Sequence, residues 1–297
     1  MSATDEGVTG RMTRTRRLGD AEVFPIGLGE MPLSLRGRPD EEQAIRTIHA
    51  ALDAGVNLID TADAYAYDQT DIGHGERLVA KALRGRRDGV LVATKGGHTR
   101  NGQAWEVDGR PEYIRAACEA SLRALETDRI DLYQYHRPDP RVPYADTIGA
   151  FKELQDEGKV RWIGVSNANI GQLEEALAIV DIVSVQNQLA LNFTSPISKG
   201  EVAFATERGI AFLPWSPLGG IGRAGSTERV APVTEAAEAH GVSPQQVALA
   251  WLLALSPVTI PIPGSSRPET IIDSVAAAEL ELSEAEVEAI SRAAGAA

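Results

Sequence analysis

Short apolar runs rich in β-branched and aromatic residues alternate along this chain with longer amphipathic stretches. Eight runs have the length of strands and cover residues 24–28, 56–60, 90–95, 130–136, 160–165, 182–186, 210–215 and 258–262. Several of them are apolar throughout, which is typical of parallel strands covered on both faces. The pattern therefore predicts a parallel sheet whose strands are separated by helices.

Helix signals lie between these runs. A helix is expected to begin at Pro111, because proline fits the first turn and an apolar stripe follows it. A second helix is predicted over residues 145–158, where a glycine ends the periodic pattern. Ser243, which precedes a proline, predicts the N-cap of a third. Strand–helix alternation repeated eight times predicts an α/β fold of the closed (β/α)₈ barrel (TIM barrel) type, with a doubly wound open sheet as the alternative.

Two further elements lie outside the repeat. Residues 16–18 and 21–23 flank a Gly-Asp turn and predict a β-hairpin that plugs the floor of the barrel. Ser283 and Glu286 have capping-box spacing and predict an extra C-terminal helix over residues 283–294. Residues 1–15 are expected to be a flexible tail, and residues 16–297 a single domain.

Composition narrows the classes of function. The chain has 42 acidic and 29 basic residues among its 297, a formal net charge of −13, which argues against nucleic acid and anionic membranes as partners. A single cysteine, Cys118, excludes an intramolecular disulfide and a cysteine-based zinc site, and we expect it to be buried filler. The N-terminus lacks the apolar core of a signal peptide, so we expect a cytoplasmic protein.

Ionisable residues stand where the predicted strands end, which is where barrel enzymes carry their chemistry. Asp60 and Lys95 end neighbouring strands, so we expect an ion pair between them, and Tyr65 follows in the next loop. A tyrosine beside an ammonium group has a stabilised phenolate and gives up its proton more easily. His136 ends the next strand and is expected to donate a hydrogen bond to the same oxygen. Each residue also has a structural reading, as a cap, a solvated strand end or a core histidine, but together they predict a carbonyl-reducing site.

Sequence blocks around these residues resemble the aldo-keto reductase superfamily. Residues 55–62 (GVNLIDTA), with Tyr65 and Gly75-Glu76 after them, are similar to its signature. Further blocks follow in the family's order at residues 92–95, 131–136, 164–167 and 214–218, so that the resemblance runs from about residue 16 to residue 291. It implies a (β/α)₈ barrel that uses NADPH, or alternatively NADH, without a metal ion and without a separate dinucleotide-binding domain.

The resemblance also implies roles for individual residues. Tyr65 is the implied proton donor, Asp60 and Lys95 the pair that tunes it, and His136 the group that orients the carbonyl. The residues implied in cofactor binding are Gly29, Met31, Ser166, Asn167, Gln186, Trp215, Ser216, Leu218, Gly220, Gly264, Ser265, Ser266 and Arg267. Among these Ser166, Asn167 and Gln186 are expected to hold the nicotinamide carboxamide and Trp215 to stack on the ring. The last three are expected to meet a 2′-phosphate, although Asp273-Ser274 replaces the Glu-Asn pair that many members carry near the adenine.

The substrate is expected to be a small carbonyl compound. Residues 108–112, 136–140 and 157–160 are similar to bacterial pyridoxal reductases, which implies pyridoxal as a substrate, whereas Leu189-Ala190 depart from the Tyr-Asn of common relatives. Trp105, in the loop after the Lys95 strand, is a predicted pocket wall, with a solvent-shielding surface residue as the alternative reading. Two other functions remain open: an NAD(P)-dependent sugar or polyol dehydrogenase, and a nucleotide-binding regulatory subunit.

Overall fold

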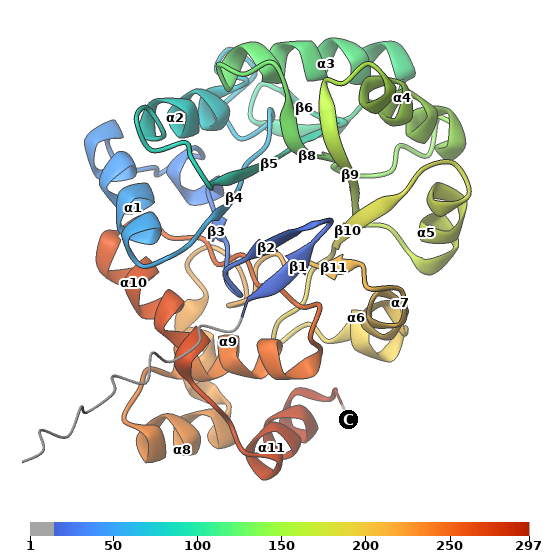
Figure 1. Ribbon diagram of the computed structural model, residues 1–297. Coiled ribbons are helices and arrows are strands. Elements are labelled where there is room, and N and C mark those ends of the chain that lie inside the picture. Colours follow the sequence, from blue (N-terminus) through green and yellow to red (C-terminus); the bar gives the residue numbers. More distant parts are fainter. Residues whose placement is uncertain (1–14, 297) are drawn as a thin grey trace, which may run out of the picture.

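Seven parallel strands form a curled sheet in the computed structural model, which describes residues 15–296. Their hydrogen-bonded order is β11 (Ala211–Phe212), β10 (Ile182–Gln186), β9 (Val160–Ser166), β8 (Ile130–Tyr135), β5 (Leu91–Gly96), β4 (Leu58–Asp60) and β3 (Leu28–Gly29). Figure 1 looks along the axis of this sheet and shows the helices arranged around its outside. The alternation in the sequence correctly predicted the (β/α)₈ barrel.

The eighth predicted strand is an extended segment that closes the ring without forming a regular ladder. On one side the Gly29 amide donates to the carbonyl of Pro263 (3.0 Å), and on the other the Ile260 amide donates to the carbonyl of Phe212 (2.8 Å). Pro261 and Pro263 have no N–H group, so donors are missing along the side that faces β3. The barrel therefore closes through fewer hydrogen bonds than the prediction of a full strand implied.

Three other predicted strands are shorter than expected. The run at residues 56–60 is a strand only at Leu58–Asp60. The run at residues 24–28 contributes only Leu28, to a strand at Leu28–Gly29, and the run at residues 210–215 is a strand only at Ala211–Phe212. The last two runs each contain a proline, Pro25 or Pro214, which cannot donate to a ladder. These are corrections to strand length, and the segments keep their predicted places in the ring.

The outer layer consists of helices that follow the strands. They are α1 (Glu41–Asp53), α2 (His74–Ala82), α3 (Pro111–Ala124), α4 (Tyr144–Asp156), α5 (Ile170–Leu177), α6 (Ser195–Ser198), α7 (Glu201–Arg208), α8 (Ala231–His240), α9 (Pro244–Leu255), α10 (Pro268–Ala276) and α11 (Glu284–Ala294). Three short 3₁₀ helices, η1 (Met31–Leu33), η2 (Ala224–Arg229) and η3 (Ala277–Glu279), complete the described elements. The predicted N-cap of α9 is confirmed, because Ser243 Oγ accepts the amide of Gln246 at 3.1 Å. The capping box of Ser283 and Glu286 is confirmed at α11.

The predicted hairpin closes the floor of the barrel. It consists of β1 (Arg16–Leu18) and β2 (Ala21–Val23), which cross the centre of the ring in Figure 1. Leu18 and Val23 are completely buried and pack with Leu58, Leu132 and Ile260 from inside the barrel. The opposite end, where the strands finish, is therefore the end left open for a site. The tail predicted for residues 1–15 falls, apart from Thr15, outside the described residues.

A second hairpin follows β5 and was not predicted. It consists of β6 (His98–Asn101) and β7 (Ala104–Val107), joined by the two-residue turn Gly102-Gln103. A glycine at the first central position of a two-residue turn is a hairpin signal, but the flanking residues are mostly polar and lack the alternation of a half-buried strand. Trp105 therefore lies on a β-strand and not in an irregular loop. Within residues 15–296, no helix is both long enough and apolar enough to cross a membrane.

Candidate active site

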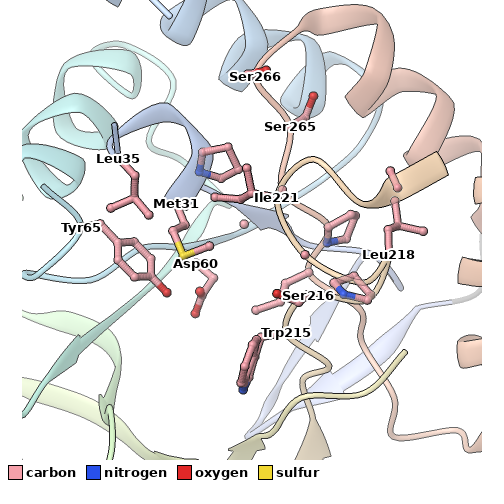
Figure 2. Close-up of a pocket in the computed structure, with 18 of the residues that line it drawn as sticks. Met31, Leu35, Asp60, Tyr65, Trp215, Ser216, Leu218, Ile221, Ser265 and Ser266 are labelled. Atoms are coloured by element: carbon pink, nitrogen blue, oxygen red, sulfur yellow. The ribbon is translucent and has the colours of Figure 1, made fainter. Parts of the chain in front are cut away.

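A pocket of about 690 Å³ opens at the carboxyl ends of the barrel strands. Apart from Lys95, which lies completely buried behind it, every residue predicted for the site lines this pocket. Those residues are Gly29, Met31, Asp60, Tyr65, Trp105, His136, Ser166, Asn167, Gln186, Trp215, Ser216, Leu218, Gly220, Gly264, Ser265, Ser266 and Arg267. Figure 2 shows Tyr65 and Asp60 on one side of the pocket and Leu218 on the opposite side. Ser265 and Ser266 lie along its upper edge in this view. Asp60, Tyr65 and His136 thus line the reactive end of the pocket, while Arg267 lines the far end.

Lys95 connects two of the predicted catalytic groups. Its ammonium donates to Asp60 Oδ2 at 2.6 Å and to the Tyr65 hydroxyl at 3.1 Å. A third hydrogen bond, to the carbonyl of Thr61 at 2.8 Å, uses its remaining N–H. Burial on its own lowers the pKa of Lys95, but the charge of Asp60 and the contact with Tyr65 outweigh this, so that the pKa is raised. Lys95 is therefore a fixed buried cation beside the phenol.

Asp60 is held in place by two glutamines as well as by Lys95. Its Oδ1 accepts from Gln186 Nε2 at 2.8 Å and from Gln134 Nε2 at 3.2 Å. Both glutamines come from barrel strands, so the sheet itself fixes the carboxylate. Gln134 was missed in the sequence, although its position two residues before His136 on a predicted strand placed it on the same face.

The structure corrects the expected acidity of Tyr65. Burial raises the pKa of its hydroxyl above the ordinary value of 10.0, while Lys95 lowers it only in part. The carboxylates of Asp60 and Glu30 add to the increase. Sequence position alone suggested the attraction to Lys95 but not the loss of solvent that opposes it. Tyr65 consequently holds its proton at neutral pH, in the state that a proton donor requires.

His136 is an uncharged imidazole at the same end of the pocket. Burial lowers the pKa of His136 well below its ordinary value, and the positive charges of Lys95 and Arg137 lower it further. Its ring lies edge-on to that of Tyr65, with centroids 5.7 Å apart. A neutral ring with one N–H is able to donate a hydrogen bond to a carbonyl oxygen bound next to Tyr65.

Aromatic rings build the outer wall of this end. The Trp105 ring, 41% exposed, lies edge-on to Tyr65 with centroids 6.3 Å apart and edge-on to His98 at 5.3 Å. It also lies edge-on to His136 with centroids 6.4 Å apart, and the guanidinium of Arg100 lies 4.1 Å from its ring centroid. Trp105 is therefore both a pocket wall and a partly solvated residue, so both readings of the sequence describe part of its position.

The residues expected to hold the carboxamide bond to one another in this structure. Asn167 Nδ2 donates to the carbonyl of His136 (2.9 Å) and to Ser166 Oγ (3.0 Å), while Ser166 Oγ donates to the carbonyl of Gln186 (2.8 Å). Asn167 also has a left-handed backbone with φ 56°, which asparagine tolerates better than most residues. These contacts fix the amide and hydroxyl groups against the end of β9.

The far end of the pocket differs in one respect from expectation. Ser265 Oγ donates to the carbonyl of Arg267 at 2.8 Å and accepts its amide at 3.2 Å, so the serine hydroxyl stabilises a local turn. Its hydrogen is thus already engaged, which leaves Ser266 and Arg267 as the groups placed to meet a phosphate. No carboxylate among residues 15–296 forms an ion pair with the exposed Arg267 side chain.

Two glycines allow the backbone to approach closely in the middle of the pocket. A Cβ on Gly29 would lie 2.7 Å from the carbonyl oxygen of Ile262, and one on Gly264 would lie 2.7 Å from Pro32 Cγ. Any larger residue would push the closing segment away from β3 or fill the pocket. Met31, in the adjoining η1 helix, and Leu35, just after that helix, also line the pocket (Figure 2).

A further carboxyl group, Glu30, lies beside the site and was not singled out in the sequence. It is completely buried and accepts hydrogen bonds from Ser34 Oγ and from Thr61 Oγ1, the latter at 3.0 Å. Burial raises the pKa of Glu30 to about 8, although these hydrogen bonds and Lys95 act in the opposite direction. Glu30 precedes η1 without any motif that marks it, so only the fold reveals this position. In the part of the chain that the structure describes, no group of three His, Cys, Asp or Glu side chains is arranged to hold a metal ion.

The chain is similar in sequence and in fold to known proteins. The sequence profile of the aldo/keto reductase family matches residues 25–294. An uncharacterised oxidoreductase of Schizosaccharomyces pombe is 33% identical over 288 residues, which cover 95% of this chain and 90% of that protein. The solved structure of a glycerol dehydrogenase from Gluconobacter oxydans is similar with a TM-score of 0.82 at 26% identity, covering 95% of both chains. An aldo/keto reductase from Klebsiella pneumoniae in complex with NADP and acetate has a TM-score of 0.79 at 27% identity, again over 95% of both chains.

Proposed function

Because the chain belongs to the aldo/keto reductase family, a family of oxidoreductases, we propose that it reduces the carbonyl group of an aldehyde or ketone with NADPH. The observation that carries this proposal is the buried chain Asp60–Lys95–Tyr65, which ends at a phenol lining the pocket. A neutral phenol beside a fixed cation is suited to protonate an oxygen on which negative charge develops.

The pocket suits a nicotinamide dinucleotide in several places. Trp215 offers a flat indole face, and no hydrogen-bond partner is found among the described residues for its buried Nε1. Gly29 and Gly264 keep the middle of the pocket free of side chains, and Arg267, for which no ion pair is found among the described side chains, provides a guanidinium at the far end. The relative from Klebsiella pneumoniae, whose structure holds NADP, supports the same cofactor for this chain.

Each catalytic side chain has a distinct task in the proposed reaction. Bound NADPH supplies the hydride that forms the new C–H bond at the carbonyl carbon. His136 and Tyr65 orient the carbonyl oxygen by hydrogen bonds, and Tyr65 then transfers its hydroxyl proton to the oxygen, giving the alcohol. Lys95 stabilises the phenolate that remains until Tyr65 takes up a proton from solvent. Asp60 keeps Lys95 aligned and balances its charge.

The wall beside Tyr65 favours planar aromatic substrates, and we propose pyridoxal among them. Trp105, His98 and His136 present ring edges and faces around the reactive end, which suits a flat heteroaromatic ring. The resemblance of residues 108–112 and 136–140 to pyridoxal reductases points the same way. Oxidation of a polyol is the second candidate, because a glycerol dehydrogenase is similar to this chain over 95% of its length.

The test is a spectrophotometric assay of NADPH consumption with pyridoxal, simple benzaldehydes and, in reverse, glycerol with NADP⁺. We expect reduction of aldehydes by the wild-type protein and a loss of about 10²- to 10⁴-fold in kcat for Tyr65→Phe, with the NADPH dissociation constant nearly unchanged. Efficient glycerol oxidation without aldehyde reduction would favour the second candidate. NADPH binding without turnover of any substrate would instead indicate a regulatory subunit.

A further inference from the structure

The rim of the pocket beside the reactive end carries an arginine whose role the reaction does not explain. Arg137 follows His136 directly, lines the pocket and is exposed. Its Nε donates to His98 Nε2 at 3.3 Å, and one terminal nitrogen donates to Asn167 Oδ1 at 3.1 Å. A guanidinium has five N–H donors, so three are left for a ligand or for water.

The charge of Arg137 is not balanced by a neighbouring carboxylate. No ion pair to it is found among the side chains that the structure describes, whereas three other arginines are paired: Arg38 with Asp71, Arg110 with Asp108 and Arg141 with Asp139. The two groups that hold Arg137 are a neutral imidazole and an amide. Burial and the Arg137 charge lower the pKa of His98 to about 4, so His98 accepts the hydrogen bond without adding charge.

A second guanidinium adds to the positive potential of the same wall. Arg100 lies behind Trp105, is only 9% exposed, and its Nε and one terminal nitrogen have no hydrogen-bond partner among the described residues. Asp68 is the acidic group that acts on it, through space and without an ion pair. In a chain with a net charge of −13, Arg137, for which no ion pair is found among the described residues, and Arg100, on which Asp68 acts only through space, together give this side of the pocket a local positive charge.

We propose that Arg137 is an anion subsite for the substrate, so that the enzyme prefers carbonyl compounds that also carry a carboxylate or phosphate group. This inference rests on the proposed reductase function and names its substrate class. The guanidinium is held at the rim by His98 and Asn167, and it would bind the anionic group while the carbonyl lies between Tyr65 and His136. Pairing an anion with a fixed guanidinium at a partly enclosed site strengthens binding more than the same contact in free solution.

The neighbouring side chain Asn167 suggests a competing role. Because Arg137 donates to Asn167, which is expected to hold the carboxamide, its alternative role is to order the cofactor end alone. The two roles differ in what they discriminate: a cofactor-ordering residue affects all substrates equally, whereas an anion subsite affects charged substrates selectively. A ratio of activities on matched substrates therefore separates them.

The experiment compares carboxybenzaldehydes with their methyl esters, which differ by a charge while keeping the reacting aldehyde. We measure kcat and KM for the ortho, meta and para isomers, at low and high ionic strength, with wild type, Arg137→Gln and Arg137→Lys. Pyridoxal phosphate against pyridoxal forms the second arm and distinguishes a phosphate preference from a carboxylate preference. Arg110→Gln is the matched control, because Arg110 is an exposed arginine nearby that is already paired with Asp108 at 2.6 Å.

For the wild type we expect a higher kcat/KM on at least one carboxybenzaldehyde than on its methyl ester. The difference should come from a lower KM for the acid and should become smaller at high ionic strength. Arg137→Gln should reduce this acid-to-ester ratio about tenfold, Arg137→Lys should retain part of it, and Arg110→Gln should leave it as in the wild type. Equal ratios in wild type and Arg137→Gln, or an increase in the NADPH dissociation constant with no change in the ratio, would overturn the subsite. Absence of turnover with all of these aldehydes would overturn the reductase proposal itself, and the subsite with it.

Discussion

Replacement of Glu30 by glutamine is expected to stabilise the protein, and to do so most at alkaline pH. Glu30 is completely buried between β3 and η1, where Ser34 and Thr61 donate hydrogen bonds to its carboxyl group. Glutamine has nearly the same shape, and the serine and threonine hydroxyls are able to rotate to meet its amide. The substitution therefore removes the ionisation while preserving most of the packing.

The magnitude follows from the displaced pKa. The pKa of Glu30 is raised from 4.5 to about 8, so the folded state favours the protonated form. Its contribution to stability is complete below pH 4.5 and is lost as the pH rises through 8, because unfolding then allows the group to ionise in water. The gap between the two pKa values sets an upper bound on the stability that the wild type loses, relative to low pH, when this group can ionise in the unfolded state. This bound is about 5 kcal/mol above pH 8 and about 3 kcal/mol at pH 7. With relaxation of the site, we expect Glu30→Gln to raise the free energy of unfolding by about 1–3 kcal/mol at pH 8 and by much less at pH 5.

Urea unfolding of both proteins at pH 5, 6, 7 and 8, followed by far-ultraviolet circular dichroism, measures this difference. Glu42→Gln serves as the control, since Glu42 is an exposed glutamate on α1 paired with Arg46 and should change the free energy of unfolding by less than about 0.5 kcal/mol at every pH. If the stabilities of Glu30→Gln and wild type run parallel between pH 5 and 8, Glu30 has no raised pKa and the reasoning is refuted.

Three further substitutions test the site. Lys95→Met should lower kcat about as much as Tyr65→Phe does, because the buried cation beside the phenol is lost, and a kcat and pH–rate profile like those of the wild type would contradict that role. Trp215→Ala should weaken NADPH binding, measured by fluorescence titration, while the thermal unfolding temperature stays close to that of the wild type; the opposite pattern would make Trp215 a core residue. Arg267→Ala should weaken NADPH binding by about 10- to 100-fold and leave NADH binding almost unchanged, and an equal effect on both cofactors would remove Arg267 from a 2′-phosphate site.

The sequence predicted the barrel and the positions of its proposed catalytic groups for the same physical reason. Parallel strands place their carboxyl ends on one side, so residues that end neighbouring apolar runs are bound to meet, as Asp60 and Lys95 do at 2.6 Å. The hairpin β1–β2 and the caps at Ser243 and Ser283 were predictable because their signals are local. Each of these features depends on contacts between residues close in the chain or on a repeated pattern.

Features that depend on burial and on distant contacts were not predictable in this way. The sign of the Tyr65 pKa shift depends on how completely the barrel removes water, and adjacency to Lys95 does not reveal that. The burial of Glu30, and with it the raised pKa of its carboxyl group, depends on α2 and β4, which are distant in the sequence. The packing is so close that a Cβ on Gly75 of α2 would lie 2.4 Å from its carboxyl oxygen. The irregular eighth segment, in contrast, was predictable from the sequence. Pro261 and Pro263 have no N–H group, so the segment cannot form a full hydrogen-bond ladder with β3.

Asp273 stands where many members of the family carry a residue near the adenine, and its contacts suit a structural role that can be tested. Its carboxylate accepts from Ser243 Oγ at 2.7 Å and from Gln246 Nε2 at 2.6 Å, and so ties α10 to the N-terminus of α9. A carboxylate near a helix N-terminus is also favoured by the helix dipole. Asp273→Ala should therefore lower the free energy of unfolding by about 1–3 kcal/mol and change the NADPH dissociation constant less than about threefold. Because Asp273 also lines the pocket, the reverse result, unchanged stability with NADPH binding weakened more than about tenfold, would show that its carboxylate serves the adenine and not the helix.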